Sequence, residues 1–198
     1  MTTTTVRRIG IRSAHPIPKL GKSFATTISP WVVPLAALEQ ARVTPPAQEP
    51  EPLPYLRDTL SWGLDIDLTV SLNGQVISRP RFATMYWTGA QQLAHLTVNG
   101  AALRTGDLYG SGTVSGFRRD EMGSLLELTA GGREPLPLPG GQPQGYLADG
   151  DTVTLSGSAP GPAGTRIEFG CAAGRIAGAV DQPGPAAWNA ASAAPGVS

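Results

Sequence analysis

The chain has 198 residues, with 15 basic and 15 acidic side chains, and Gly (25) and Pro (19) together make up more than a fifth of it. Average proteins contain roughly 12% Gly plus Pro, so long helices are not expected to dominate, although 40% apolar residues suffice for a core. The balanced charge excludes a bulk polyanion binder, so no nucleic-acid partner is expected, and the single cysteine, Cys171, excludes an internal disulfide.

The N-terminal segment, residues 1–22, carries five basic residues and no acidic one. This composition is typical of an organelle transit peptide, but Pro16 and Pro18 would break the amphipathic helix that such a peptide needs. Residues 1–20 are therefore predicted to be an irregular N-terminus. The uncharged run that follows, Ser23–Leu38, is interrupted by two prolines and is too short to span a membrane.

The clearest period-2 pattern lies in residues 62–72, where five apolar side chains alternate with polar ones. Asn73-Gly74 supplies the two left-handed positions of a type I′ turn, and residues 75–78 return as a second strand. The pattern predicts a hairpin with one solvated face. Asp65 and Asp67 share that face; they could form a metal pair, but a solvated edge is the preferred interpretation.

Met85–Val98 is predicted to be the main helix, because apolar residues recur at helical spacing and Asn99-Gly100 ends the run. A proline-rich surface connection is expected over residues 41–56, and residues 179–198 are expected to form a disordered Ala/Pro/Gly tail. Several short strands and one helix indicate a mainly β fold, a sandwich or roll. The predicted strand segments are Asp107–Val114, Ser124–Thr129, Thr152–Ser156 and Thr165–Phe169.

The residues that could carry chemistry are few. Lys22 is one of only two lysines against 13 arginines, and its compact ammonium could contact an oxyanion or a metal's oxygen ligands; chance retention of a surface lysine is the alternative. By alternation Glu127 would lie half-buried in a strand, where it could orient a base or a metal. The histidines are His15, in the irregular start, and His95, for which a structural or surface role is expected mid-helix.

The glycine-rich run Gly110–Gly116 lacks the lysine of a phosphate-binding loop. Its backbone is expected to approach either another strand or a ligand closely.

These same segments closely resemble the fumarylacetoacetase (fumarylacetoacetate hydrolase) family. The resemblance extends in order over residues 21–178 and matches the C-terminal part of the family's catalytic domain. It includes the distinctive Ser-Pro-Trp-Val-Val-Pro and Tyr-Trp-Thr stretches. The matching segments are Gly21–Pro34, Met85–His95, Val98–Gly100, Leu103–Leu108, Gly112–Gly116, Gly123–Leu128, Asp149–Asp151 and Phe169–Ile176.

The resemblance implies a hydrolase that cleaves the C–C bond of a 1,3-diketone, converting fumarylacetoacetate and water to fumarate and acetoacetate in tyrosine and phenylalanine catabolism. It further implies an Mg²⁺ or Ca²⁺ cofactor, a small-molecule diketone as ligand, a homodimer, a cytoplasmic location and an incomplete mixed β-sandwich or roll. In the family a metal chelates the diketone, and a histidine ordered by a glutamate activates water.

Carried over residue by residue, Lys22 matches the family's catalytic lysine beside the metal, and Thr26 matches a threonine near the same metal. Thr113 matches a substrate-binding threonine, and Glu127 matches the catalytic glutamate that orients the histidine. The histidine itself, the metal carboxylates and the Arg and Gln of the anion site lie upstream in the family and have no counterpart here. His15 does not match that histidine in its surroundings.

Residues 1–20 depart from the family pattern, and a damaged or mis-started reading frame is preferred to a new functional N-terminus. Two further functions stay open. The chain could be a non-catalytic remnant that retains only folding or subunit-interface capacity, or an unrelated β-rich binding module. Upstream coding sequence with a paired-Glu metal segment would identify a truncated enzyme.

Overall fold

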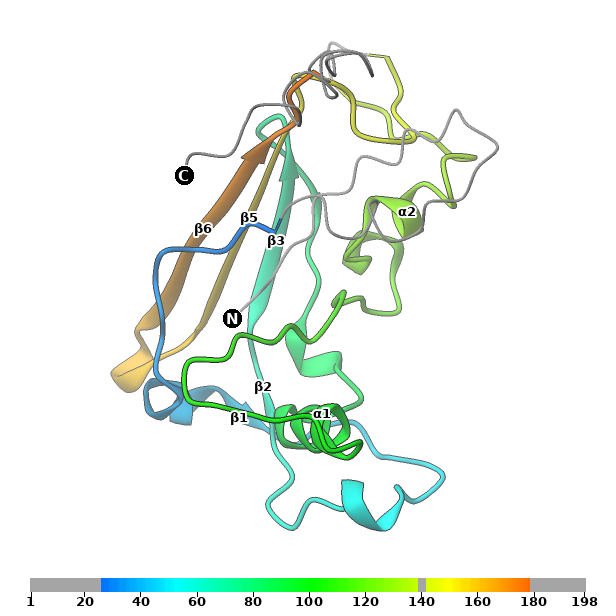
Figure 1. The fold of residues 1–198 in the computed structure, drawn as a ribbon. Helices are drawn as coiled ribbons and strands as arrows, with labels where there is room; N and C mark the ends of the chain where they lie inside the picture. Colours follow the sequence, from blue (N-terminus) through cyan, green and yellow to red (C-terminus); the bar gives the residue numbers. More distant parts are fainter. Residues whose placement is uncertain (1–25, 139–141, 179–198) are drawn as a thin grey trace, which may run out of the picture.

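The computed structural model describes residues 26–138 and 142–178 of the chain. Its main feature is a four-stranded antiparallel sheet of order β4-β3-β5-β6. The strands are β3 (Asp67–Leu72), β4 (Gln75–Ser78), β5 (Thr152–Pro160) and β6 (Arg166–Arg175), and a smaller antiparallel pair joins β1 (Arg42–Val43) to β2 (Gly63–Leu64). Figure 1 shows β3, β5 and β6 side by side, with both α-helices away from β6. The mainly β fold is confirmed.

The predicted hairpin is present as β3 and β4. Asn73 and Gly74 both adopt positive φ angles, 51° and 82°, as a type I′ turn requires. Along β3 the apolar side chains Leu68, Val70 and Leu72 are buried while their neighbours are exposed or half-buried. The alternation of apolar residues and the Asn-Gly turn therefore predicted this hairpin correctly.

Two apolar clusters form the core around the sheet. The first gathers Leu38, Ala41, Ile66, Leu68, Val114 and Ala159, and the second gathers Val70, Leu72, Val153 and Ile176. The first cluster matters for function, because it fixes Val114, the neighbour of Thr113, against β3 and β5. Buried apolar contact of this kind is the main force that holds an otherwise irregular segment in place.

The main helix, α1, runs over Gly89–Thr97 and is shorter than predicted at its N-terminal end. Thr88 is extended and forms a capping box with Gln91: its hydroxyl accepts the Gln91 N–H, while the Gln91 side chain accepts the Thr88 N–H. This cap begins the helix at Gly89, so Met85 lies outside it. Gly100, at φ 86°, follows the helix end as the sequence indicated.

Two of the predicted strands are wrong. Residues 107–114 contain no strand, and positive φ angles at Gly106 and Gly112 interrupt the extended backbone there. Residues 124–129 form a single helical turn, α2 (Leu125–Leu128), which Ser124 caps. The other two predicted strands are present and are longer than predicted, as β5 and β6. Short 3₁₀ helices complete the described chain: Leu35–Ala41, Pro54–Leu56, Phe82–Thr84, Arg119–Glu121 and Pro162–Gly164.

Large apolar side chains remain exposed on the described surface. Phe117 is 96% exposed, Val32 76% and Trp31 69%, and residues 101–110 lie in an exposed irregular segment. Single exposed apolar residues are routine in monomeric proteins, so these positions carry no functional argument by themselves. Across the described ranges no helix has the length and apolar character needed to cross a membrane.

Candidate functional site

Thr113 and Glu127, two of the four predicted site residues, lie at the two ends of a tight loop over residues 113–127. Its closest contact is between Gly123 and the carbonyl group of Val114, where a Cβ on Gly123 would overlap the Val114 oxygen. That Cβ would also lie 3.0 Å from the Thr113 methyl carbon. Position 123 therefore has no room for a side chain. Glycine there allows the two arms of the loop, residues 113–115 and residues 123–127, to touch.

The Glu127 carboxylate is held by two serine hydroxyls. Ser115 Oγ lies 3.0 Å from Glu127 Oε1 and 2.9 Å from Oε2, and Ser124 Oγ lies 2.6 Å from Oε2. Each serine also accepts a backbone N–H: that of Gly123 at 3.0 Å for Ser115, and that of Glu127 itself at 3.2 Å for Ser124. These five groups, from four residues, form one small hydrogen-bonded cluster.

The expected environment of Glu127 is wrong. Its side chain is exposed on the helical turn α2 and does not lie half-buried in a strand. The reason is the cap at Ser124: once its hydroxyl accepts the N–H three residues later, Glu127 becomes the third residue of a helix. Its carboxylate is therefore presented on the surface of the described chain, where a group from another segment could reach it.

The other site residues that the structure describes are Thr113 and Thr26. Thr113 is exposed beside the buried Val114. Thr26 is exposed too, three residues before Ser29, whose hydroxyl donates to the Phe169 carbonyl of β6 at 2.6 Å. Lys22, the lysine expected in the catalytic and metal site, falls outside the described residues, as do His15, the irregular N-terminus and the predicted 179–198 tail.

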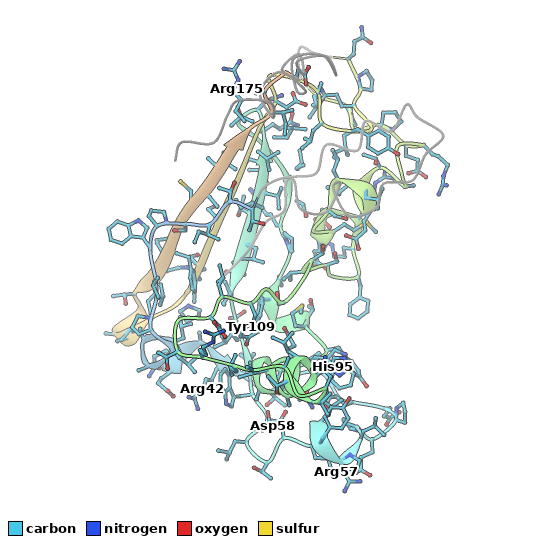
Figure 2. The ribbon with its side chains drawn as sticks, in the orientation of Figure 1. Arg42, Arg57, Asp58, His95, Tyr109 and Arg175 are labelled. Atoms are coloured by element: carbon cyan, nitrogen blue, oxygen red, sulfur yellow. The ribbon has the colours of Figure 1, made fainter. Side chains whose placement is uncertain are left out.

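His95, on α1, contacts Tyr55 of the 3₁₀ helix Pro54–Leu56. Its Nδ1 lies 3.0 Å from the Tyr55 hydroxyl, and the two rings are stacked with centroids 6.3 Å apart. Figure 2 shows His95 at the same end of the molecule as Asp58. The Asp58 carboxylate accepts hydrogen bonds from the Thr88 hydroxyl and the Leu60 N–H, so the polar groups around α1 mainly bind one another.

The two aspartates of the predicted hairpin form ion pairs with arginines. Asp65 binds Arg81 at 3.1 Å, and Asp67 binds Arg166 at 2.8 Å. A solvated, arginine-paired edge therefore describes these carboxylates better than a metal pair does. In the loop before Gly123, the side-chain hydrogen bond from Arg118 lowers the pKa of Asp120 below its usual range.

Within residues 26–138 and 142–178, no three His, Cys, Asp or Glu side chains lie together in a way that could hold an ion. A hard divalent cation requires six or more oxygen ligands, largely anionic, and a threonine hydroxyl such as Thr26 supplies only one neutral oxygen. The described residues therefore do not fit a magnesium or calcium site by themselves.

Sequence reasoning missed Ser115 and Ser124. The Ser124-x-x-Glu127 spacing is a capping-box signal and could have predicted both the helical turn and the serine's place beside the carboxylate. Ser115 is twelve residues from Glu127, and no local pattern indicates that contact.

Comparison with known proteins agrees with the family resemblance of the sequence. The profile of the family described as fumarylacetoacetate (FAA) hydrolase C-terminal matches residues 4–177. Fumarylacetoacetase of Arabidopsis thaliana is 50% identical over 165 residues, and those of Homo sapiens and Mus musculus are each 47% identical over 165 residues. Each alignment covers 80% of this chain but 39% of the relative, so the chain spans about two-fifths of the length of these relatives.

Proposed function

The chain belongs to the fumarylacetoacetate hydrolase family and corresponds to the C-terminal part of a fumarylacetoacetase; on that basis we propose that it supplies part of the active site of an enzyme that hydrolyses the C–C bond of a 1,3-diketone. The proposed substrate is fumarylacetoacetate, and the products are fumarate and acetoacetate. The observation that carries the proposal is the loop that places Thr113 beside Gly123 and presents the Glu127 carboxylate, since the sequence resemblance predicts a functional role for both residues.

In the proposed reaction the oxygen of water bonds to the fumaryl carbonyl carbon. The C–C bond from that carbon to the methylene between the two keto groups then breaks, and its electron pair leaves as the enolate of acetoacetate. The proton that the general base took from water is returned to this carbon, which becomes the methyl group of acetoacetate. Glu127 accepts a hydrogen bond from a histidine of the upstream portion and fixes its orientation as the general base. Thr113 contacts the substrate, and the Lys22 ammonium stabilises the negative charge that develops.

Mg²⁺ or Ca²⁺ is the proposed cofactor of the whole enzyme. Because the described residues do not form a metal site, the upstream portion would have to supply the carboxylates, with Lys22 and Thr26 next to the ion. A homodimer is the proposed assembly, and tyrosine and phenylalanine breakdown the proposed pathway.

The test compares two proteins: the 198-residue chain alone, and the same chain fused behind the upstream portion of the human relative. Loss of the diketone's ultraviolet absorbance is followed with added Mg²⁺ or Ca²⁺. The fusion is expected to hydrolyse fumarylacetoacetate, and the chain alone is expected not to. A folded fusion that binds the diketone without turnover would contradict the proposal and favour the alternative of a non-catalytic remnant.

A further inference from the structure

We propose that Ser115 and Ser124 are positioning residues that hold the Glu127 carboxylate in a fixed orientation toward the general base, an inference that rests on the proposed function. Glu127 is exposed and its side chain has several rotatable bonds, so without partners it would sample many rotamers. Two hydroxyl donors on different segments restrict it to one.

The direction of each hydrogen bond follows from the chemistry of its partners. A backbone N–H can only donate, so Ser115 Oγ accepts from Gly123 and has its single hydrogen left for Glu127. Ser124 Oγ accepts the Glu127 N–H in the same way and gives its hydrogen to Oε2. Both serine protons are therefore directed at the ionised carboxylate, which only accepts.

Helix capping explains Ser124 but not Ser115. In a reciprocal capping box the glutamate would reach back to the backbone N–H of the capping residue. Here the carboxylate binds hydroxyls, and one of them comes from residue 115, outside the helical turn. Ser115 thus joins the arm that carries Thr113 to the arm that carries Glu127.

The contacts also leave one oxygen with room for a further donor. Ser124 donates to Glu127 Oε2 at 2.6 Å, and the single hydrogen of Ser115 is shared between Oε2, at 2.9 Å, and Oε1, at 3.0 Å. A carboxylate oxygen accepts about two hydrogen bonds. Oε1 is therefore the atom that the histidine N–H would meet. Groups that orient metal-ligating residues are typically worth about 10- to 100-fold in metal affinity or activity, and we expect an effect of similar size for the partners of Glu127.

The first experiment uses the 198-residue chain as it is. Carbodiimide labelling with glycine ethyl ester, read by peptide mass spectrometry, reports how freely Glu127 reacts, with the exposed Glu168 of β6 as internal reference. Ser115→Ala and Ser124→Ala should each raise the labelling rate of Glu127 relative to Glu168 by about fivefold, the effect of losing one ordinary hydrogen bond. Unchanged rates in both variants would overturn the proposal.

Ser78→Ala is the matched control for that labelling. Its hydroxyl donates to the carbonyl oxygens of Asp120 and Met122, in the same loop, without touching Glu127. The variant should leave the labelling ratio unchanged, which separates loss of the carboxylate's partners from general loosening of the loop. An equal rise in Ser78→Ala would overturn the proposal.

The second experiment uses the fused enzyme. Ser115→Ala should lower kcat about 10-fold or more with little change in KM, and Ser115→Thr, which keeps a hydroxyl, should restore most of it. In a Glu127→Gln background the serine substitution should have little further effect. If Glu127→Gln lowers kcat but Ser115→Ala does not, the positioning role is wrong and the proposed function stands. If Glu127→Gln keeps parental kcat, both are wrong.

Discussion

The backbone of Gly123 packs against the carbonyl group of Val114 so closely that no side chain fits between them. Val114 is in turn buried in the main core cluster, 5% exposed, and so its position is fixed by the sheet. The geometry of the loop that carries Thr113 and Glu127 therefore depends on residue 123 being a glycine.

Gly123→Ala is expected to destabilise the chain by about 1–3 kcal/mol, the usual cost of forcing an extra methyl group into a packed site. It should also move the Thr113 arm away from the Glu127 arm. Gly89→Ala is the control, because a Cβ there would meet its nearest neighbour, the Tyr109 hydroxyl, at an ordinary 3.8 Å. Urea unfolding of the two variants gives the comparison, and equal midpoints would contradict this account of Gly123.

A second prediction concerns Gln91, which is 3% exposed and uses all of its amide hydrogen-bonding groups. Its oxygen accepts from Gln48 at 2.9 Å and from the Thr88 N–H at 3.0 Å, and its nitrogen donates to Gln48 and to the Leu56 carbonyl, both at 2.8 Å. Gln91→Leu would leave buried polar groups without partners.

The expected loss for Gln91→Leu is about 1–3 kcal/mol in the free energy of unfolding. Gln92→Ala, on the same helix, removes one exposed contact with the Trp87 carbonyl and should cost far less. Denaturant titration measures both. A Gln91→Leu chain as stable as the parent would show that the proline-rich connection does not depend on this amide.

Gln91 also shows which part of the fold the sequence alone could not predict. The hairpin at Asn73-Gly74 was predictable, because alternation and turn chemistry are both local. The start of α1 was not, since the pattern of apolar residues does not reveal that Thr88 and Gln91 cap each other. The most buried residue of that helix is a glutamine, and two of its partners, Gln48 and Leu56, lie more than 30 residues away in sequence.

The prediction of a half-buried strand position for Glu127 was wrong for a related reason. A short apolar run such as Leu125–Leu128 is compatible with either a strand or a helical turn, and periodicity alone does not separate them. Ser124 decides the outcome in favour of a helical turn. Lys22 and Glu127 were predicted from the sequence pattern itself and Thr26 and Thr113 from family resemblance, whereas the contact of Glu127 with Ser115 depends on the tertiary fold.

The third prediction concerns the carboxylate itself. In the fused enzyme Glu127→Gln should retain metal binding and lower turnover by about 10²–10⁴, because an amide cannot stabilise a positively charged histidine as a carboxylate does. Glu168→Gln, at an exposed position on β6, is the control and should keep parental turnover. Near-normal activity of Glu127→Gln would reassign the residue to structure.

The fourth prediction concerns Lys22. In the fused enzyme Lys22→Ala should lower kcat about 10²–10³-fold, as expected when a donor to developing negative charge is removed. Lys22→Arg should fail almost as badly, since a planar guanidinium does not replace a compact ammonium in a crowded site. Lys19→Arg is the matched control, at the chain's other lysine. If Lys22→Arg is nearly as active as the parent, the small lysine count has no functional meaning.

The last prediction concerns metal binding by the chain alone. A calcium or magnesium site needs several anionic oxygens, and the described residues bring no such cluster together. Calorimetric titration of the 198-residue chain with Ca²⁺ or Mg²⁺ should therefore show a dissociation constant of about 10⁻³ M or weaker, and Thr26→Val should not change it. In the fused enzyme binding should tighten, and there Thr26→Val should weaken it mildly, because only one neutral ligand is lost. Micromolar binding by the isolated chain would show that its own residues complete a site, and the metal would then have to be assigned to this portion of the enzyme.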